Sequence, residues 1–560
     1  MQKTLEHLDL FIEEQMAAAG TPGMVVALTD GRSLLHVAPH GLADVAAGRP
    51  VEPDTLFEIG SISKSFTAIA LLQLREAGLV DLHSPVRRYL PWFHVPPAPG
   101  LEGQAGMDLI TLHHLLTHTA GIVRGTDFST EGRYEVWSLR DTVAATPPGT
   151  FFHYCNVGYK ALGVILEEVL GLAYDEIIAG RIFRPLGMDA SEAVITHDTR
   201  RRLAVGYESL FDDRPFHRSL PLAPAPWLET GTADGSIAST PADMAAYVRL
   251  LLNRGRGLLS EEGFGLWAGR LVPLPEDEGE RGEFYGYGLQ VGDEDGHTIV
   301  SHSGGMVGYY AAIAADLEGD LGAVALCNGP GEPMAVARRA LRLVRWAREG
   351  RGLPPAPAGP ERVEDAGAYA GIYRPYKRET RGENSNASEI ESEIGDEIKI
   401  AVSAGGAGLE LRLAGQRAAL ERRGEDCFYA PHPALSRYLL RFARREGQVV
   451  EAWCGPELFV RPGCAGEAAP EPPAAWRAYT GHYRCHNPWL GNFRVVLRRD
   501  RLILALPWGE EQPLVPLAEA VFRVGDDERL PERLRFDTVL GGRARRANLA
   551  GCDYYRTFTP

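Results

Sequence analysis

Two proline-rich stretches divide this chain of 560 residues into three parts and thereby limit the folds that it can adopt. The first stretch spans residues 351–360, and the second spans residues 468–473. Proline and glycine at this density are typical of linkers, because they interrupt helices and central strands. We therefore expect one large amino-terminal domain at residues 1–350 and two smaller domains at residues 361–465 and 474–560.

A short tyrosine motif follows each linker. Tyr369-Ala370-Gly371-Ile372-Tyr373 comes after the first linker, and Tyr479-Thr480-Gly481-His482-Tyr483 comes 110 residues later, after the second. This recurrence indicates two copies of one module. Alternating apolar and polar residues, as in Leu409–Leu413 and Phe493–Leu497, favour strands, so each module is expected to be a small antiparallel β-barrel. The polar segment 378–397 is interpreted as a loop.

The first part of the chain has the pattern of an α+β domain. In chain order we expect a helix near residues 2–14, strands near 23–28 and 33–37, a helical middle, strands around 287–291 and 322–327, and a helix at 334–348.

Lys64 is one of only five lysines, whereas the chain has 53 arginines. A buried lysine ammonium can give up its proton and an arginine guanidinium cannot, so lysine at this position indicates acid or base chemistry. Lys64 stands three residues after Ser61, and the apolar residues that continue to Gly78 predict an amphipathic helix. Ser61 would lie in the first turn with Lys64 on the same face, as a nucleophile and its base require. A Ser-x-x-Lys sequence alone arises by chance too often to establish this.

Two further segments support the assignment. One contains Tyr154-Cys155-Asn156 and leads into a helical run at Ala161–Leu170, and the other is His302-Ser303-Gly304-Gly305, which follows a strand-like stretch. Ser-x-x-Lys, Tyr-x-Asn and Lys/His-Thr/Ser-Gly, in this order, resemble the motifs of the penicillin-recognising serine hydrolases. That family includes class C β-lactamases, D-alanyl-D-alanine carboxypeptidases, related esterases and D-aminopeptidases. The resemblance covers roughly residues 5–345.

The resemblance implies a fold and a set of catalytic roles. The fold would be an antiparallel sheet with an all-helical lobe and the active site between them; with two barrels behind it, the layout looks most like the D-aminopeptidases. Ser61 would attack a carbonyl, and Lys64 and Tyr154 would move its proton to the leaving group. Asn156 would hold the substrate amide and Lys64. The backbone N–H groups of Ser61 and Gly305 would stabilise the oxyanion.

The resemblance also implies that His302, Ser303, Gly304 and Gly305 bind the substrate. Family members that act chiefly as β-lactamases usually have a lysine at the position of His302, a permanent cation that receives the substrate carboxylate. Histidine is mostly neutral at pH 7 and offers a weaker, pH-dependent anchor. We therefore expect weak or no β-lactamase activity and a closer match to carboxypeptidase, D-aminopeptidase or esterase relatives.

Other chemistries receive little support from the sequence. His114 and His118 are four residues apart, but no glutamate or third ligand completes a zinc site, so we interpret them as structural and expect no metal. Cys155 is interpreted as a small filler. The chain has no Gly-x-Ser-x-Gly elbow, which argues against an α/β-hydrolase, and no glycine-rich phosphate loop after a strand. We expect no cofactor.

Charge and composition limit the partners. The net charge of −16 and the absence of a long basic run argue against nucleic acid and anionic membranes. No apolar stretch approaches the roughly 18 residues that span a bilayer. Seven scattered cysteines and the absence of an apparent leader favour a cytoplasmic location. The expected partner is a small-molecule or short peptide substrate, and the sequence leaves a homo-oligomer open.

Two functions from different classes stay open. The preferred one is a serine hydrolase that cleaves a small amide or ester through an acyl-enzyme, with D-amino-acid peptides as the leading substrates. A loop of the last module, His486–Asn492, is a hypothesis for a segment that narrows the cleft and selects short substrates. The alternative is a penicillin-binding sensor that is acylated but scarcely turns over, with the β modules recognising a ligand.

Overall fold

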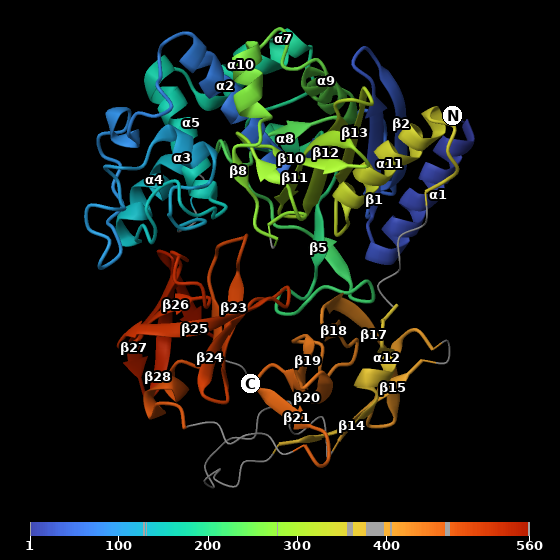
Figure 1. Ribbon diagram of the computed structural model, residues 1–560, viewed down its shortest axis with the longest axis vertical. Coiled ribbons are helices and arrows are strands. Elements are labelled where there is room, and N and C mark those ends of the chain that lie inside the picture. The colour runs from blue at the N-terminus through green and yellow to red at the C-terminus, as the bar shows by residue number, and fades with distance from the viewer. Residues whose placement is uncertain are drawn as a thin grey trace.

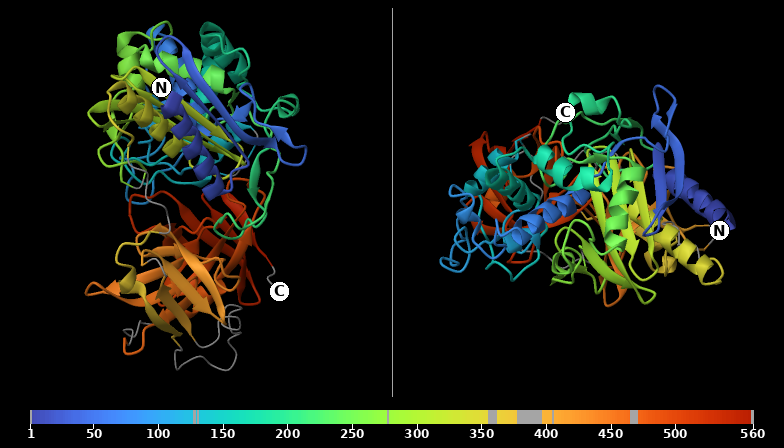
Figure 2. Two further views of the ribbon diagram at one scale, coloured as in Figure 1. Left: turned by 90° about the vertical axis from the view of Figure 1, so that its right-hand side faces the viewer. Right: turned by 90° about the horizontal axis from the view of Figure 1, so that it is seen from above.

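The structure, a computed structural model, describes residues 2–126, 129, 131–276, 278–354, 362–376, 397–403, 406–464 and 471–557. It confirms the predicted fold class, because an antiparallel sheet with a helical lobe is followed by two closed barrels (Figure 1). In Figure 1 and in the left panel of Figure 2, the amino-terminal domain lies at one end of the molecule and the barrels lie at the other. Of the polar segment 378–397, only Glu397 lies within the described residues.

The amino-terminal domain is built on a nine-stranded antiparallel sheet with the order β3-β2-β1-β13-β12-β11-β10-β9-β8. Its strands are β1 (Gly23–Thr29), β2 (Leu34–Asp44), β3 (Arg49–Pro50), β8 (Val272–Pro273), β9 (Phe284–Tyr285), β10 (Gln290–Glu294), β11 (His297–Met306), β12 (Tyr309–Asp316) and β13 (Leu321–Cys327). Because β1 pairs with β13, with Met24 opposite Cys327, the two ends of the domain meet inside one sheet.

Helices cover both faces of the sheet, which explains why β1 is buried at every position. Met24 and Val26 pack in one core with α1 (Gln2–Ala19) and α11 (Pro333–Arg348). Val25 faces the opposite core, which is shared with the helical lobe. A strand that is covered on both faces needs apolar residues throughout, without polar alternation.

The remaining helices form the lobe and its connections to the sheet. They are α2 (Ser63–Glu76), α3 (Leu112–Leu116), α4 (Gly132–Trp137), α5 (Asn156–Leu170), α6 (Tyr174–Ile178), α7 (Arg184–Leu186), α8 (His197–Arg200), α9 (Pro241–Leu252) and α10 (Glu261–Trp267). Two short strand pairs, β4 (Phe57–Glu58) with β7 (Ala238–Ser239) and β5 (Tyr207–Ser209) with β6 (Leu222–Pro224), complete the domain. None of the helices in the described part of the chain is both long and apolar enough to cross a bilayer.

One strand lies further along the chain than the sequence predicts. A strand was expected around residues 287–291, but β9 ends at Tyr285 and β10 begins at Gln290. Gly288 between them has a φ of 78°, and a Cβ atom there would lie 2.8 Å from backbone atoms of Ser65. The chain turns at this glycine because it passes close to α2, a tertiary contact that the apolar pattern does not reveal.

Two closed barrels of eight strands follow. The first begins after α12 (Ala366–Tyr369) and consists of β14 (Gly371–Pro375), β15 (Ile398–Val402), β16 (Leu409–Leu413), β17 (Gln416–Gly424), β18 (Cys427–Tyr429), β19 (Leu440–Arg445), β20 (Gln448–Cys454) and β21 (Glu457–Val460). The second begins after a 3₁₀ turn, η5 (Ala474–Ala478), and consists of β22 (Gly481–Arg484), β23 (Asn492–Arg498), β24 (Arg501–Ala505), β25 (Glu511–Ala518), β26 (Val521–Val524), β27 (Arg533–Leu540), β28 (Arg543–Leu549) and β29 (Cys552–Arg556).

The repeated tyrosine motif makes the same hydrogen bond in both barrels. The Tyr373 hydroxyl donates to the Tyr369 carbonyl at 2.8 Å, and the Tyr483 hydroxyl donates to the Tyr479 carbonyl at 2.7 Å. In each case the bond joins the first strand of the barrel to the short helical turn before it. This agreement supports the interpretation of the barrels as two copies of one module.

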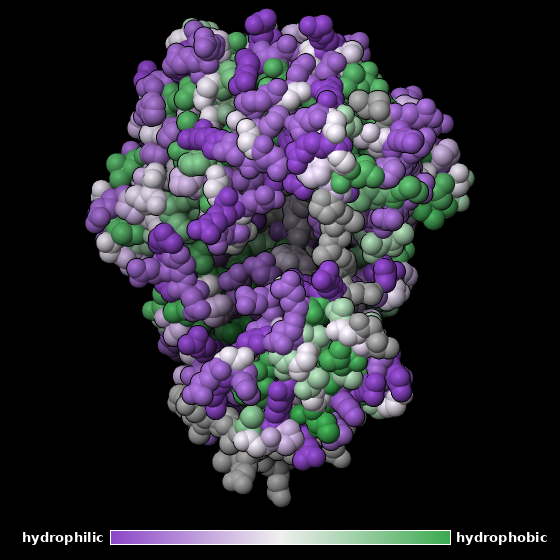
Figure 3. Space-filling model, turned by 45° about the vertical axis from the view of Figure 1, so that its right-hand side comes forward, coloured by the Kyte–Doolittle hydropathy of each residue, from purple (hydrophilic) through white to green (hydrophobic). Residues whose placement is uncertain are grey.

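A hairpin of the amino-terminal domain reaches both barrels (Figure 1). In the loop between β5 and β6, the Asp213 carboxylate accepts a hydrogen bond from Arg494 of the second barrel at 2.9 Å. In the same loop, the Phe216 carbonyl accepts one from Arg423 of the first barrel at 2.8 Å. Figure 3 shows that the molecular surface is hollowed near this junction. Side-chain contacts as well as linkers therefore join the three parts.

Candidate active site

Ser61 and Lys64 lie at the start of α2 and are joined by a hydrogen bond. Ser61 belongs to a 3₁₀ turn, η1 (Gly60–Ile62), that runs directly into the helix. The Nζ atom of Lys64 lies 3.0 Å from the Oγ atom of Ser61. Lys64 is completely buried, whereas Ser61 is partly exposed. The serine therefore occupies a tight turn before the helix, rather than its first turn as predicted, and still faces the lysine.

Two glycines allow β11 to lie against this turn. Gly60 has a φ of 53°, and a Cβ atom on it would lie 2.6 Å from the nitrogen of Gly305. A Cβ atom on Gly304 would lie 1.9 Å from the carbonyl oxygen of Ile59. A side chain at either position would push the strand away. The backbone of Gly305 therefore runs beside the serine turn, which is the placement that a pair of oxyanion-binding N–H groups requires.

Lys64 contacts groups from two other segments. It donates a hydrogen bond to the carbonyl oxygen of Asp234 at 2.9 Å. Its Nζ atom lies 4.9 Å from the ring centre of Tyr154 and 5.7 Å from that of Tyr159, and aromatic faces attract an ammonium group. The structure thus brings Ser61, Lys64 and Tyr154 together around one point.

Tyr154 and Asn156 are held at the start of α5. The backbone N–H of Asn156 donates to the carbonyl of Arg124 at 2.8 Å. The Sγ atom of Cys155 accepts a hydrogen bond from the N–H of Gly158 at 3.2 Å, so this thiol caps the helix, a role that its interpretation as a filler missed. The Oδ1 atom of Asn156 is buried without a hydrogen-bond partner among the described residues, and a bound group could satisfy it.

His302 is connected to His118 through Tyr285. The Tyr285 hydroxyl lies 3.1 Å from His302 Nε2 and 3.2 Å from His118 Nε2. Because His118 Nδ1 accepts a hydrogen bond from the N–H of Cys155, the proton of neutral His118 is on Nε2, which donates to Tyr285. The Tyr285 hydroxyl then donates to His302 Nε2, and His302 Nδ1 donates to the Ser303 carbonyl. Every member of this chain is satisfied when both histidines are neutral.

The electrostatic environment agrees with this assignment of protons. Burial, together with the positive charge of Lys64, lowers the pKa of His302 to about 4. Burial and the same lysine hold the pKa of His118 well below its usual value. Both imidazoles are therefore uncharged at neutral pH.

The four strand residues expected to bind substrate alternate in exposure. Ser303 and Gly305 are exposed, whereas His302 and Gly304 are buried. This alternation follows from the two-residue period of a strand. Ser303 and Gly305 are therefore accessible from outside, while His302 is 3% exposed and its ring nitrogens are bonded within the protein.

His114 and His118 do not share a site. The Nδ1 atom of His114 accepts a hydrogen bond from the N–H of Thr111 at 3.1 Å, and the Thr111 hydroxyl accepts one from the N–H of His114, so this pair caps α3. Together with the bonds of His118 to Cys155 and Tyr285, this geometry agrees with a structural interpretation of both histidines.

A buried charged cluster behind Lys64 was not predicted. Lys160 Nζ lies 2.6 Å from each carboxylate oxygen of Glu135 and 4.0 Å from Oδ2 of Asp234, the residue whose carbonyl accepts from Lys64. Among the lysines that the structure describes, only Lys64 and Lys160 are buried. The rarity of lysine, which drew attention to Lys64, could therefore have identified Lys160 as well.

The second barrel contacts His153, which directly precedes the Tyr-x-Asn motif, and Arg124, whose carbonyl binds the motif. The Glu532 carboxylate accepts a hydrogen bond from the N–H of Arg124 at 3.0 Å and lies 2.8 Å from Nε2 of His153. Burial opposes the charge of Glu532, but His153 and the N–H donor outweigh it and lower the pKa of this carboxyl group. Glu532 precedes β27 and thus lies outside the loop 486–492 considered above.

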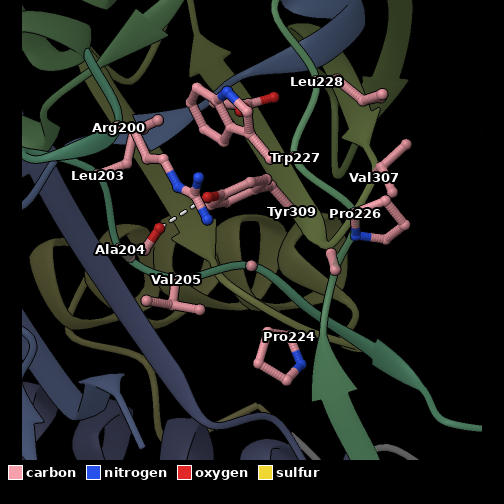
Figure 4. A pocket seen from close by; sticks show the side chains of 13 residues that line it. Arg200, Leu203, Ala204, Val205, Pro224, Pro226, Trp227, Leu228, Val307 and Tyr309 are labelled. Atoms are coloured by element: carbon pink, nitrogen blue, oxygen red, sulfur yellow. Dashed lines mark hydrogen bonds between the residues drawn. The ribbon is translucent and has the colours of Figure 1, made fainter. Parts of the chain in front are cut away.

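A cavity of about 120 Å³ lies between the strand that leads to Ser61 and the turn after β11 (Figure 4). Arg200, Trp227 and Tyr309 form part of its wall, and the Arg200 guanidinium lies 5.0 Å from the centre of the Trp227 ring. The Tyr309 hydroxyl donates to the Ala204 carbonyl at 2.7 Å. The wall is mostly apolar, and one carboxylic acid side chain also lines it.

That acid is Glu58, three residues before the candidate nucleophile. Glu58 is 5% exposed, and its carboxyl group makes no hydrogen bond or ion pair within the described chain. Burial raises its pKa to about 8. At neutral pH Glu58 is therefore a neutral acid inside the domain.

Comparison with known proteins assigns the family. The β-lactamase family model matches residues 8–345, which is more than half of the chain. The chain is 27% identical over 324 residues to penicillin-binding protein 4 of Amycolatopsis lactamdurans, covering 55% of this chain and 81% of that protein. It is 31% identical over 199 residues to esterase EstB of Burkholderia gladioli, covering 32% of this chain and 49% of the esterase.

A solved structure is similar over a longer range. The octameric penicillin-binding protein homologue from Pyrococcus abyssi has a TM-score of 0.57 and 26% identity, covering 82% of this chain and all of that one. The similarity extends beyond the range of the family model, into the part of the chain that forms barrels. These findings confirm the resemblance inferred from the three motifs: the protein belongs to the β-lactamase family of serine hydrolases.

Proposed function

We propose that this protein hydrolyses a small amide or ester through an acyl-enzyme, and that D-aminoacyl amides or short D-amino-acid peptides are its substrates. Ser61 Oγ attacks the substrate carbonyl carbon while its proton passes to Lys64, 3.0 Å away. The oxyanion accepts hydrogen bonds from the N–H groups of Ser61 and Gly305. Tyr154 helps to deliver the proton to the leaving amine or alcohol as its bond to the carbonyl breaks, and Asn156 holds the substrate amide. Water then hydrolyses the ester on Ser61.

The choice of substrate depends on the neutral state of His302. A β-lactam, or a peptide that ends in D-alanine, carries a carboxylate near the reacting carbonyl. Burial gives His302 a pKa of about 4, so at neutral pH it offers that carboxylate no charge. Substrates without a carboxylate lose nothing by this, which favours aminoacyl amides and simple esters over β-lactams.

Two further observations support the proposal. Similarity to a protein named as an esterase supports the ester branch. The two barrels behind the catalytic domain support the D-aminopeptidase branch, whose three-part layout this chain resembles.

A substrate panel tests this function. Purified protein is assayed with D- and L-alanine amide, p-nitrophenyl acetate, D-alanyl-D-alanine and a chromogenic cephalosporin, with Ser61→Ala as the control. We expect kcat/KM for the D-amide or the ester to exceed that for the two carboxylate-bearing substrates by at least about tenfold, as loss of one charged contact predicts. A preference for the cephalosporin, or equal activity of Ser61→Ala, would refute the proposal.

The alternative, an acylatable sensor, is favoured by similarity to penicillin-binding protein 4 of Amycolatopsis lactamdurans and penicillin-binding protein 4* of Bacillus subtilis, which is 28% identical over 333 residues. Product released in excess of enzyme excludes this alternative. A stable acyl adduct in mass spectrometry, without turnover of any substrate in the panel, would support it instead.

We also propose that the protein forms a homo-oligomer, because the solved relative is described as octameric. Size-exclusion chromatography with light scattering tests this: a species at the chain mass of 61.1 kDa at all concentrations would contradict it.

A further inference from the structure

The buried cluster of Lys160, Glu135 and Asp234 connects the helical lobe to Lys64. Lys160 lies on α5, one turn after Asn156 and on the same face. Its ammonium group binds both oxygens of Glu135 on α4 at 2.6 Å and lies 4.0 Å from the Asp234 carboxylate. The Asp234 carbonyl accepts a hydrogen bond from Lys64 at 2.9 Å. Asp234 thus contacts two lysines: its carboxylate faces Lys160, and its backbone carbonyl binds Lys64.

Gly163 allows part of this close approach. A Cβ atom on Gly163 would lie 2.3 Å from the Cβ of Ala233, so α5 packs directly on the segment that contains Asp234. Gly132 of α4 also lies beside the lysine stem, because a Cβ atom there would make an ordinary van der Waals contact, 3.6 Å, with the Cβ of Lys160. The cluster therefore sits where α4, α5 and the Asp234 segment meet, and a shift in any of them would move the carbonyl that binds Lys64.

The cluster has one cation for two carboxyl groups. Lys160 is 7% exposed and Glu135 is 3% exposed. Burial opposes the charge of Lys160, but Asp234 and Glu135 outweigh it and raise the pKa of the ammonium group. Burial dominates at Glu135 and raises its pKa to about 7, although Lys160 acts in the opposite direction. The Oδ1 atom of Asp234 is buried without a hydrogen-bond partner among the described residues.

We propose that Lys160 and Glu135 are positioning residues for the catalytic amine, because together they set the net charge and the placement of Asp234 beside Lys64. This inference rests on the proposed function, in which Lys64 is the base. A buried ion pair is often no more stabilising than well-packed apolar side chains of similar size would be. The presence of such a pair behind a catalytic lysine therefore points to a role in tuning that lysine.

The proposal predicts opposite effects for its two members. Without Lys160, the carboxyl groups of Glu135 and Asp234 lose the cation that offsets their negative charge, and the field that remains beside Lys64 favours its charged form. Without the charge of Glu135, Lys160 pairs with Asp234 alone, the negative field at Lys64 weakens, and the neutral amine is favoured.

Other titratable or charged groups also face the cluster and Lys64. Those around Lys64 are Tyr154, Tyr159, Cys155, His118 and His302. Cys155 also faces Lys160, Tyr174 faces Asp234, and the Arg124 guanidinium lies 5.7 Å from the centre of the Tyr154 ring. Burial keeps both histidines and the Cys155 thiol neutral near pH 7. The charge that changes between the two variants is therefore that of the cluster itself.

The test is the pH dependence of kcat/KM with p-nitrophenyl acetate, a substrate without charge. The acidic limb of this pH profile is the fall in kcat/KM at low pH, where the base Lys64 becomes protonated. We expect Lys160→Met to move this limb to higher pH by about one unit or more, and Glu135→Gln to move it to lower pH. Lys160→Arg keeps the charge and should keep the limb while lowering kcat, because a planar guanidinium does not fit the ammonium site. Because glutamine has nearly the same shape as glutamate, the Glu135→Gln variant should fold, and its pH profile can be measured even if Lys160→Met does not fold.

A matched control is Arg345→Met. Arg345 is 3% exposed and donates to the buried carboxylate of Asp316 at 3.0 Å, on α11 at the opposite face of the sheet. The Arg345→Met variant should have a lower free energy of unfolding, and the acidic limb of its pH profile of kcat/KM should not move. Unshifted limbs in both cluster variants, or shifts in the same direction, would overturn the inference while leaving the hydrolase intact. Undiminished activity of Ser61→Ala would instead overturn the proposed function.

Discussion

The buried acid Glu58 should make the catalytic domain lose stability as the pH rises toward 8. Its carboxyl group ionises with a pKa of about 8 in the folded protein, against 4.5 as its ordinary value. Between these two values the unfolded chain has released the proton and the folded chain has kept it. The unfolded state therefore binds fewer protons, and the free energy of unfolding decreases with pH throughout this interval.

The size of the effect follows from this interval. Each pH unit between the two pKa values costs about 1.4 kcal/mol, so the whole interval is worth about 5 kcal/mol. Glu58→Gln keeps the shape of the side chain and cannot ionise. The difference in unfolding free energy between the natural protein and this variant should therefore move against the natural protein by about 3 kcal/mol between pH 5.5 and pH 7.5.

Urea unfolding, followed by tryptophan fluorescence at half-unit steps of pH, measures this difference. Trp227 lines the same cavity as Glu58 and reports on the catalytic domain. Glu6→Gln, at an exposed position of α1, is the control and should show a difference that changes little with pH. A constant difference between natural protein and Glu58→Gln would show that Glu58 is already ionised at pH 5.5 and that the reasoning from burial is wrong.

Four further substitutions test the site. Ser61→Ala should lower kcat by about 10⁴-fold or more without a change in the far-ultraviolet circular dichroism spectrum, and retained activity would exclude Ser61 as the nucleophile. Lys64→Arg should be nearly as inactive, because arginine cannot accept the proton; full activity would leave Lys64 as a fixed charge only. Glu532→Ala removes two charge-assisted contacts and should lower kcat about tenfold or more; an unchanged kcat would separate the barrel from catalysis. His302→Lys should raise the relative kcat/KM for D-alanyl-D-alanine over D-alanine amide, and no change in that ratio would refute the role given to the neutral imidazole.

The sequence predicts the local parts of this site and misses the long-range ones. The pairing of Ser61 with Lys64 follows from helical spacing, and the repeated tyrosine motif predicts two barrels because each copy closes the same local hydrogen bond. Tyr285 is 167 residues from His118, and no local pattern marks it as the bridge between two histidines. The shifted strand near Gly288 has the same origin, since a contact with α2 overrides the apolar pattern. The cytoplasmic location and the roles of the individual site residues stay predictions.

The contact between Glu532 and His153 has a consequence for how the protein is synthesised. The two residues are 379 positions apart, and ribosomes add roughly 5–20 residues per second, so roughly 20–80 seconds pass between their appearance. During that time the segment around His153 has left the ribosome without the carboxylate that holds it. A newly made chain should therefore gain full hydrolytic activity only after the second barrel has been synthesised and has closed.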